Sequence, residues 1–419
     1  MASILSLAWR SLLNRRTSAI LTILTIAVSV VLLMGVERIR TEAKDSFAHT
    51  ISGTDLIVGG RSGQVNLLLY SVFRLGNATN NIDWQSYQHF AHHRLVKWAI
   101  PISLGDSHKG FRVMGTNQDY FKFYQYGSKQ KLAFQQGRPF TGLFDAVIGA
   151  QVAKKLGYNL GSEMILAHGI SDVAFARHDN LPFKVVGILK PTGTPVDKTI
   201  HVSLEAISAI HVGWESGAHI GKTPTVEQLQ QYDLQPKEIT AMMLGLKSRV
   251  YAFALQREIN TYADEPLSGI LPGVALQELW GMMSVAEQAL FIVSLFVVVA
   301  GFLGMLSSLL ASLKERRREM AILRAMGAQP RVIITLLVSE ASILTLSGLV
   351  LGVAILYCAL IVVGPLLQAQ YGLQFPLKMP SSYELKLLGS VWMAGTLVGF
   401  FPAWFAYRQS LSDGMTIKV

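Results

Sequence analysis

The sequence has almost no cysteine and few charged residues. Cys358 is the only cysteine in 419 residues, and it lies inside an apolar run. A folded domain elsewhere in the chain has no disulfide and must be stable through its own core. Charged residues make up 15% of the chain and hydrophobic residues 51%, whereas a soluble domain carries about 25% charged residues. This composition indicates a membrane protein with a sizeable water-exposed part.

The sequence also lacks the short motifs of several catalytic classes. It has no G-x-x-x-x-G-K-[ST] nucleotide-binding loop, and the Gly59–Gly60 pair lacks the required lysine. It has neither the G-x-S-x-G of serine hydrolases nor the H-E-x-x-H of metalloproteases. A membrane-anchored enzyme is therefore the least favoured class, and no catalytic residue is predicted.

Four apolar runs are long enough to cross a membrane, since a helix needs about 20 apolar residues to span the hydrocarbon core. The predicted spans are residues 17–36, 284–313, 332–367 and 387–407. The sequence thus predicts an α-helical membrane protein with four transmembrane helices. One large mixed α/β extracytoplasmic domain, residues 37–283, is inserted between the first two helices.

The first run has one feature of a signal peptide, because Arg10, Arg15 and Arg16 precede it. Its apolar stretch is longer than a typical signal-peptide core, and the following VERIRTEAKDS contains no small-residue cleavage site. We therefore predict that this run remains in place as a membrane anchor.

Basic residues are concentrated beside the apolar runs. Residues 37–283 hold 24 Lys and Arg against 21 Asp and Glu, whereas the rest of the chain holds 13 against 6. Such an excess marks the cytoplasmic flanks of membrane helices, and the balanced domain gives no sign of a nucleic-acid-binding face. This predicts cytoplasmic segments at 1–16, 314–331 and 408–419. It also predicts an external loop at 368–386 and an external domain at 37–283, which lies in the periplasm if the cell is Gram-negative.

The predicted domain combines strand and helix patterns. A stretch rich in Gly, Thr, Gln and Pro, residues 213–238, is predicted to be a loop or lid. The other predicted elements are strands at 183–190 and 239–248, a helix at 251–262, and strands that lead into helices at 146–157 and 200–210.

The loop after the second span reads LKERRREMAILRAMGAQPRVI (313–333). With the order of one span, a large external domain and three further spans, it resembles the permeases of the MacB/FtsX/LolC–LolE superfamily of ABC transporters. Members typically carry an E-R-R-x-E-hydrophobic-x-x-L-R-A-x-G-A segment in this loop. The external segments VIGAQVAKKLGYNLGSEMIL and FKVVGILKPTGTPVDKTIHVSLEAI are similar to the domain that these permeases share.

The loop also has the pattern of a short amphipathic helix that lies along the cytoplasmic face, with apolar residues on one side and arginines on the other. The resemblance implies that this is the coupling helix, which docks into a groove of the ATPase. The predicted coupling residues are Glu315, Arg316, Arg317, Arg318, Glu319, Met320, Ile322, Leu323, Arg324, Ala325, Met326 and Gly327.

The resemblance further implies partners and a mechanism. ATP and Mg would bind to a separate ATPase subunit, with no cofactor on this chain, and a second permease chain would complete a homodimer or a related heterodimer. Motion of the ATPase would reach the external domain, which would handle a lipoprotein, peptide, lipid or metal-related substrate, with a possible periplasmic partner protein. Glu340, the only charge inside the third run, either tunes the dimer or, as we favour, lies near the cytoplasmic interface paired with an arginine or Ser342.

All ten histidines lie between His49 and His219. Imidazole is the commonest metal ligand, and three of the histidines have the spacing to share one face of a helix. No cysteine accompanies them, so ordinary surface and turn histidines are the favoured interpretation. The candidate metal ligands are His89, His92, His93, His201, His211 and His219.

Two other functions fit the same pattern. One is an FtsX-like transmembrane regulator of an external cell-wall enzyme, and the other is the permease of a zinc-handling system. The large external domain favours a transport permease over a regulator. The residues that contact the substrate are not predicted.

Overall fold

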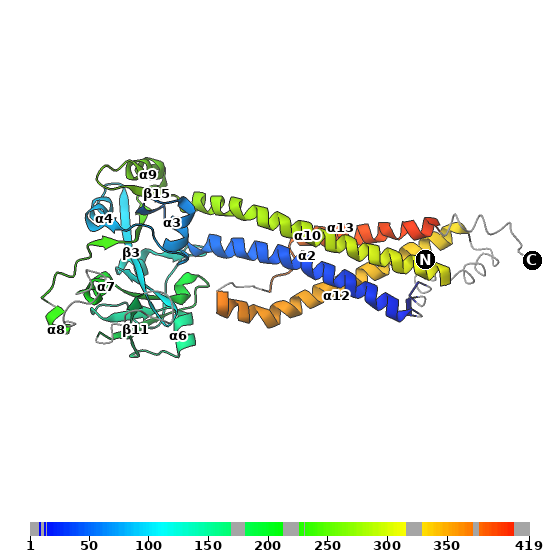
Figure 1. Cartoon of the computed structure of the whole chain (residues 1–419), viewed down its shortest axis with the longest axis horizontal. Helices are drawn as coiled ribbons and strands as arrows, with labels where there is room; N and C mark the ends of the chain where they lie inside the picture. The colour runs from blue at the N-terminus through cyan, green and yellow to red at the C-terminus, as the bar shows by residue number, and fades with distance from the viewer. Residues whose placement is uncertain are drawn as a thin grey trace, which may run out of the picture. The chain divides into compact units, whose positions relative to one another are not determined.

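The computed structural model describes residues 8–9, 12–13, 15–168, 181–212, 226–229, 231–315, 329–371 and 377–405. The chain divides into two compact units, whose elements are labelled in Figure 1. One, called the helical unit below, comprises Met1–Glu42, Ser284–Leu367 and Phe375–Val419. The other, called the sheet domain, comprises Ala43–Met283 with Gln368–Gln374.

Long apolar helices build the helical unit. Within the described ranges, 4 helical stretches are long and apolar enough to cross a membrane, at Arg16–Asp45, Pro272–Leu313, Arg331–Leu366 and Ser382–Phe405. The predicted fold class is confirmed, because a large mixed domain lies in the chain between the first and second of these helices. The helices are α2 (Arg16–Thr50), α10 (Pro272–Glu315), α12 (Pro330–Tyr371) and α13 (Ser382–Val398).

Small residues allow these helices to pack at short distance. A Cβ atom on Gly352 of α12 would lie 2.8 Å from the carbonyl oxygen of Ala27 in α2. The Ser29 hydroxyl of α2 donates a hydrogen bond of 3.1 Å to the carbonyl oxygen of Val297 in α10. Close contacts between small residues and interhelical hydrogen bonds are the main sources of helix association in an apolar surrounding.

A mixed sheet forms the centre of the sheet domain. Its strands run in the order β15-β1-β14-β3-β4-β12-β8-β11-β7, with β10 beside β3 and β9 beside β11. The long strand β3 pairs first with β14 and, further along, with β4. The pairs β4–β12 and β8–β11 are parallel.

Short elements connect these strands, and two small ribbons, β2–β13 and β5–β6, accompany the sheet. The strands are β1 (Leu56–Gly60), β2 (Ile82–Asp83), β3 (Val96–His108), β4 (Phe111–Thr116), β5 (Gln125–Tyr126), β6 (Gln130–Lys131), β7 (Phe134–Gly137), β8 (Asp145–Ile148), β9 (Glu163–Met164), β10 (Ala167–His168), β11 (Phe183–Leu189), β12 (Thr199–Ser203), β13 (Glu238–Ile239), β14 (Ala241–Leu246) and β15 (Leu267–Ile270). The helices are α3 (Gln64–Ser71), α4 (Trp84–Ala91), α5 (Asp119–Phe123), α6 (Ala150–Leu156), η1 (Pro195–Lys198), α7 (Leu204–Ile210), α8 (Val226–Leu229), η2 (Arg249–Tyr251) and α9 (Ala252–Asn260).

Hydrophobic cores cover both faces of the sheet. Every residue of β14 is buried, and successive side chains of a strand point to opposite faces. Met243 accordingly belongs to one core cluster, and Met242 and Leu244 belong to another. Glycine is required at position 245, because the indole of Trp98 occupies the space where a Cβ would lie. The domain is therefore stabilised by apolar burial on both sides of its central strands.

The predicted strands and helices of this domain are confirmed. The strands expected at 183–190 and 239–248 are β11 and the β13–β14 stretch, and the predicted helix 251–262 contains α9 and the last residue of η2. The two strand-to-helix segments are β8–α6 and β12–α7. The predicted loop or lid at 213–238 was wrong at 226–229, which form the short helix α8, and its residues 213–225 and 230 lie outside the described residues.

Candidate functional site

The predicted coupling segment lies almost entirely outside the described residues. Glu315 is the last residue of α10, and α12 begins at Pro330. The assignment of the segment as a coupling helix therefore stays a prediction. The predicted residues outside the described ranges are Arg316, Arg317, Arg318, Glu319, Met320, Ile322, Leu323, Arg324, Ala325, Met326 and Gly327.

Glu340 is buried inside the helical unit. Its side chain lies on α12 and only 2% of its surface is exposed. Ser342, a partner that the sequence suggested, accepts a hydrogen bond of 3.1 Å from the indole of Trp392 in α13. Neither predicted role of Glu340 is decided by this burial, and both stay predictions.

A buried ion pair, which the sequence did not reveal, joins α2 to α13. The Arg38 Nε atom donates to Glu384 Oε1 at 2.6 Å, and Arg38 Nη2 donates to Glu384 Oε2 at 3.3 Å. Both side chains are 6% exposed. The two parallel bonds match the planar geometry of guanidinium and carboxylate. The pair holds two helices together whose residues are 346 positions apart in the chain.

The same arginine also binds α12 and the segment before α13. Arg38 Nη2 donates to the Tyr357 hydroxyl at 2.8 Å and to the carbonyl oxygen of Lys378 at 3.0 Å. The Tyr357 hydroxyl donates to the same carbonyl at 2.7 Å, and Lys378 in turn bridges to Glu42 of α2 at 3.2 Å. We call Arg38, Glu42, Tyr357, Lys378 and Glu384 the polar clamp.

The polar clamp is built on the beginning of α13. Ser381 is the N-cap residue, and its hydroxyl accepts a hydrogen bond of 3.2 Å from the Glu384 amide. The Glu384 carboxylate returns a bond by accepting from the Ser381 amide at 2.6 Å. This capping box satisfies two otherwise free amides at the helix start and fixes the carboxylate that Arg38 binds.

The first group of predicted metal ligands does not come together in the structure. His89, His92 and His93 were expected on one helix face, but α4 ends at Ala91 and His92 is its C-cap. The His92 ring bonds to the Gln88 carbonyl oxygen at 2.9 Å. His93 faces Glu258 at 3.5 Å, and the His89 ring packs against other rings. The expectation of a shared helix face was wrong because the helix ends before it includes all three residues.

The second group is also dispersed. His201 is fully buried in β12, where its ring centroid lies 5.1 Å from that of Tyr120. His211 caps α7 and lies 3.9 Å from a carboxylate oxygen of Asp106. His219 lies outside the described residues. Across the ranges that the structure describes, no three His, Cys, Asp or Glu side chains are close enough together to hold a metal ion.

Burial makes His201 sensitive to acid. Burial, and secondarily the nearby charge of Arg74, lowers the pKa of His201 to about 3. The unfolded chain binds this proton near pH 6.5, so the unfolded state carries more protons than the folded state between these values. The stability that a neutral His201 provides is therefore complete above pH 6.5 and decreases as the pH falls toward 3.

We expect His201→Phe, which keeps a ring in this site, to reduce the pH dependence of sheet-domain stability between pH 6.5 and 4.5. Hydrogen exchange of β8 and β12 in the full chain should show less acid destabilisation in the variant than in the wild type at matched pH. Loss of the bond to the Val147 carbonyl oxygen changes stability equally at every pH. An unchanged pH slope would contradict the role of His201.

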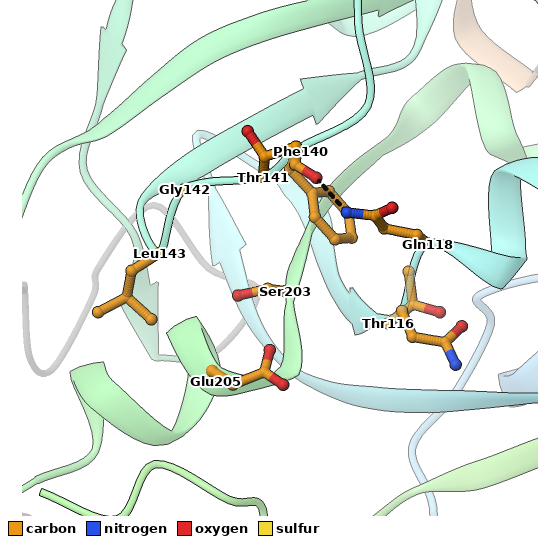
Figure 2. A pocket seen from close by; sticks show the side chains of 9 residues that line it. Thr116, Gln118, Phe140, Thr141, Gly142, Leu143, Ser203 and Glu205 are labelled. Atoms are coloured by element: carbon orange, nitrogen blue, oxygen red, sulfur yellow. Dashed lines mark hydrogen bonds between the residues drawn. The ribbon is translucent and has the colours of Figure 1, made fainter. Parts of the chain in front are cut away.

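The sheet domain also contains a polar pocket of about 400 Å³. It lies where the parallel strands β4 and β12 end, with Thr116 paired in register with Ser203. Figure 2 shows Ser203 and Glu205 across the pocket from the loop 140–143, with Thr116 and Gln118 on a further side. Crevices beyond the carboxyl ends of parallel strands are common ligand sites in α/β folds.

These features define a class of protein: a multi-pass membrane protein with one mixed α/β domain inserted after its first apolar helix. A family model described as "MacB-like periplasmic core domain" matches residues 19–262, more than half of the chain. A second model, described as "FtsX-like permease C-terminal", matches residues 291–412. The chain belongs to the MacB/FtsX family of ABC transporter permeases.

Individual relatives are distant. The pyoverdine export ATP-binding/permease protein PvdT of Pseudomonas fluorescens is 24% identical over 318 residues, which cover 73% of this chain and 42% of PvdT. The macrolide export ATP-binding/permease protein MacB of a Shewanella species is 24% identical over 307 residues, which cover 73% of this chain and 41% of that protein. The chain thus spans less than half the length of these curated relatives.

A solved structure is also similar to part of the chain. The periplasmic region of MacB from Actinobacillus actinomycetemcomitans is 12% identical, and the alignment covers 55% of this chain and 94% of that region, with a TM-score of 0.34.

Proposed function

We propose that this chain is the permease subunit that transmits ATP-driven motion of a separate ATPase to the sheet domain, on the outer side of the bacterial inner membrane. The substrate is handled there, as a lipoprotein, peptide, lipid or metal-related molecule. Family membership supports the permease role, and the 419 residues themselves contain no Walker A nucleotide-binding loop.

The observation that carries this proposal is the pairing of α2 and α10. In the helical unit, the hydroxyls of Ser18 and Ser308 lie 2.6 Å apart and Ser29 bonds to Val297. In the sheet domain, the rings of Phe47 in α2 and Trp280 in α10 lie 5.6 Å apart. The same two helices, which have no break at the unit boundaries, therefore contact each other in both units.

Under this proposal, displacement of α2 and α10 in the helical unit is passed to the sheet domain. The polar clamp supports this mechanism, because it attaches α2 to α12 and α13 at Arg38 and Glu42, the last residues of α2 that belong to the helical unit. Under this proposal, ATP binding changes the relative energies of two positions of α2.

The distribution of basic residues supports the proposed orientation in the membrane and the proposed contact with the ATPase. Arg15 and Arg16 precede the first span, and the 314–331 loop holds six basic residues, so both belong on the cytoplasmic side. The ATPase, with ATP and Mg, would bind this loop. A second permease chain would provide the remaining helix contacts, as a homodimer or a related heterodimer.

The ATPase contact can be tested at Leu323, on the apolar side of the predicted coupling helix. We expect Leu323→Asp to abolish copurification with the ATPase and to reduce coupled ATP hydrolysis in nanodiscs at least tenfold, because a carboxylate would be buried without a partner. Leu323→Met is the matched control and should retain both properties. Wild-type behaviour of Leu323→Asp would refute the assignment of the coupling helix.

The same assay also addresses the regulator alternative, because an FtsX-like regulator of a cell-wall enzyme would respond to Leu323→Asp in the same way. ATP-dependent release or transfer of a substrate by the wild-type complex would support transport. ATP-dependent activation of an external hydrolase, without transfer, would support regulation.

A further inference from the structure

We propose that the pocket at the ends of β4 and β12 binds a ligand that carries an alkylammonium group. This inference goes beyond the permease function, since it concerns binding to the sheet domain and requires neither ATP nor the ATPase. It rests on the hydrogen-bonding state and charge of the residues that line the pocket.

The pocket walls come from three separate segments. Thr116 ends β4 and is followed by Asn117 and Gln118, whereas Ser203 ends β12 and is the N-cap of α7. The loop 140–143 forms the third wall. A Cβ on Gly115, the residue before Thr116, would lie 2.7 Å from Cγ1 of Ile207. Helix α7, and with it Glu205, can therefore lie directly against β4 only because residue 115 is glycine.

Several hydrogen-bond donors in these walls are occupied. The Thr116 hydroxyl donates to the Pro101 carbonyl oxygen at 2.8 Å, and the Gln118 amide nitrogen donates to the Phe140 carbonyl oxygen at 3.1 Å, as drawn in Figure 2. In the loop, the backbone amides of residues 141 and 142 both donate to a carboxylate oxygen of Asp145, at 3.0 and 2.9 Å.

Acceptors, in contrast, remain available. The side-chain oxygen of Asn117 is buried and has no hydrogen-bond partner among the described residues. A buried acceptor without a donor is unfavourable, so a ligand N–H would compensate it if a side-chain rearrangement opened this oxygen to the pocket. Glu205, in the first turn of α7, adds an exposed carboxylate to the same pocket. The pocket therefore favours a ligand that donates hydrogen bonds.

The charge of the pocket also favours a cationic hydrogen-bond donor over an anion. Among the described residues that line the pocket, Glu205 is the only ionisable side chain. The nearby arginine, Arg138, is already engaged, since its Nη1 atom lies 3.3 Å from Asp145 and 2.5 Å from the Thr141 hydroxyl. A protonated amine is both a cation and a donor of up to three hydrogen bonds. It therefore matches the carboxylate of Glu205 and the unpaired oxygen of Asn117 together.

Spermidine is a suitable probe, because a pocket of about 400 Å³ is within the size range of small-ligand sites. The full chain would be placed in nanodiscs of phosphatidylcholine, which carry no net charge, and titrated by calorimetry. The comparison ligands are 1,8-octanediol, which is neutral, and octanoate, which is anionic; both are linear chains. We expect spermidine to bind at least tenfold more tightly than either.

Variants at position 205 test the site itself. We expect Glu205→Gln to weaken spermidine binding about tenfold, since a charge-assisted hydrogen bond is lost, and Glu205→Lys to abolish it. Glu163→Gln removes another exposed carboxylate of the sheet domain and should leave binding unchanged. In the wild type, spermidine should also slow hydrogen exchange at residues 116–118 and 203–205. Because hydrogen exchange is measured on the wild type, it tests whether spermidine binds at the pocket even if a variant fails to fold.

Three outcomes would overturn the proposal. One is that octanediol or octanoate binds as tightly as spermidine. Another is that Glu205→Gln, correctly folded, binds spermidine as the wild type does. The third is that spermidine leaves hydrogen exchange around the pocket unchanged.

Discussion

Replacing Arg38 with alanine should destabilise the helical unit by about 3–5 kcal/mol, the usual cost of leaving one partner of a buried ion pair uncompensated. The Glu384 carboxylate is 6% exposed and would keep only its bond from the Ser381 amide. Bonds from Arg38 to Tyr357 and to the Lys378 carbonyl oxygen would be lost as well. The measurement is the thermal unfolding of the purified full chain in nanodiscs, together with ATP hydrolysis by the reconstituted complex.

The matched control lies two residues further along the same helix. Arg40 is 39% exposed and pairs with Glu37 at 2.9 Å and with Glu287 at 3.9 Å, and ion pairs of such partly exposed side chains contribute about 1 kcal/mol. Arg40→Ala should therefore leave the unfolding temperature almost unchanged. A large effect of Arg40→Ala, or none of Arg38→Ala, would contradict the assignment of the polar clamp.

A double variant separates stability from transmission. Arg38→Met with Glu384→Gln removes both charges, while glutamine preserves the capping box with Ser381. We expect most of the stability to return, but α2 would lose its bonds to Tyr357 and to the Lys378 carbonyl oxygen and would keep only the Glu42–Lys378 pair of the clamp. ATP-driven changes in the sheet domain, followed by a fluorescence label there, should therefore remain impaired. Full recovery of both properties would show that the clamp only stabilises.

Gly352→Leu should have the second large effect. A Cβ at this position would lie 2.8 Å from both the Ala27 carbonyl oxygen and the Cβ of Val30, so any side chain forces α12 and α2 apart. Overpacking of this kind costs about 1–3 kcal/mol, and sometimes more. A lower unfolding temperature in nanodiscs and faster hydrogen exchange in the middle of α2 are the expected results.

Gly389 of α13 provides the comparison for this substitution. A Cβ there would meet no described atom within 4 Å, and leucine is a better helix former than glycine. Gly389→Leu should therefore leave the stability of the isolated chain unchanged or slightly raised. Equal destabilisation by both substitutions would mean that a general response to leucine, and not the contact with α2, is responsible.

Features with a strong local signal could be predicted from the sequence. The apolar runs gave the four helices, because a span requires a long uninterrupted stretch of one chemistry. The inserted domain followed from the distance between the first two runs. Strands such as β11 and β14 were also predicted, because their apolar residues are contiguous or alternate within a few positions.

The residues of the sites could not be found in this way, because they meet through tertiary structure. Arg38 and Glu384 each look like an ordinary charge beside an apolar run, and only the fold brings them within 2.6 Å. The pocket depends on the parallel pairing of β4 with β12, which no local pattern encodes. The helix face considered for His89, His92 and His93 does not form, since helix ends are the least certain part of a pattern-based prediction and α4 ends at Ala91.

The position of β1 has a consequence for how the chain is made. This strand, the first after α2, lies between β14 and β15, with Ile57 opposite both Met243 and Ile270. During synthesis it must therefore wait, with its backbone unpaired on both edges, until almost the whole domain has been translated. Such non-local pairing is slow, and unpaired edges are prone to aggregate. The centre of the sheet around β1 can therefore be completed only after β15 has been released.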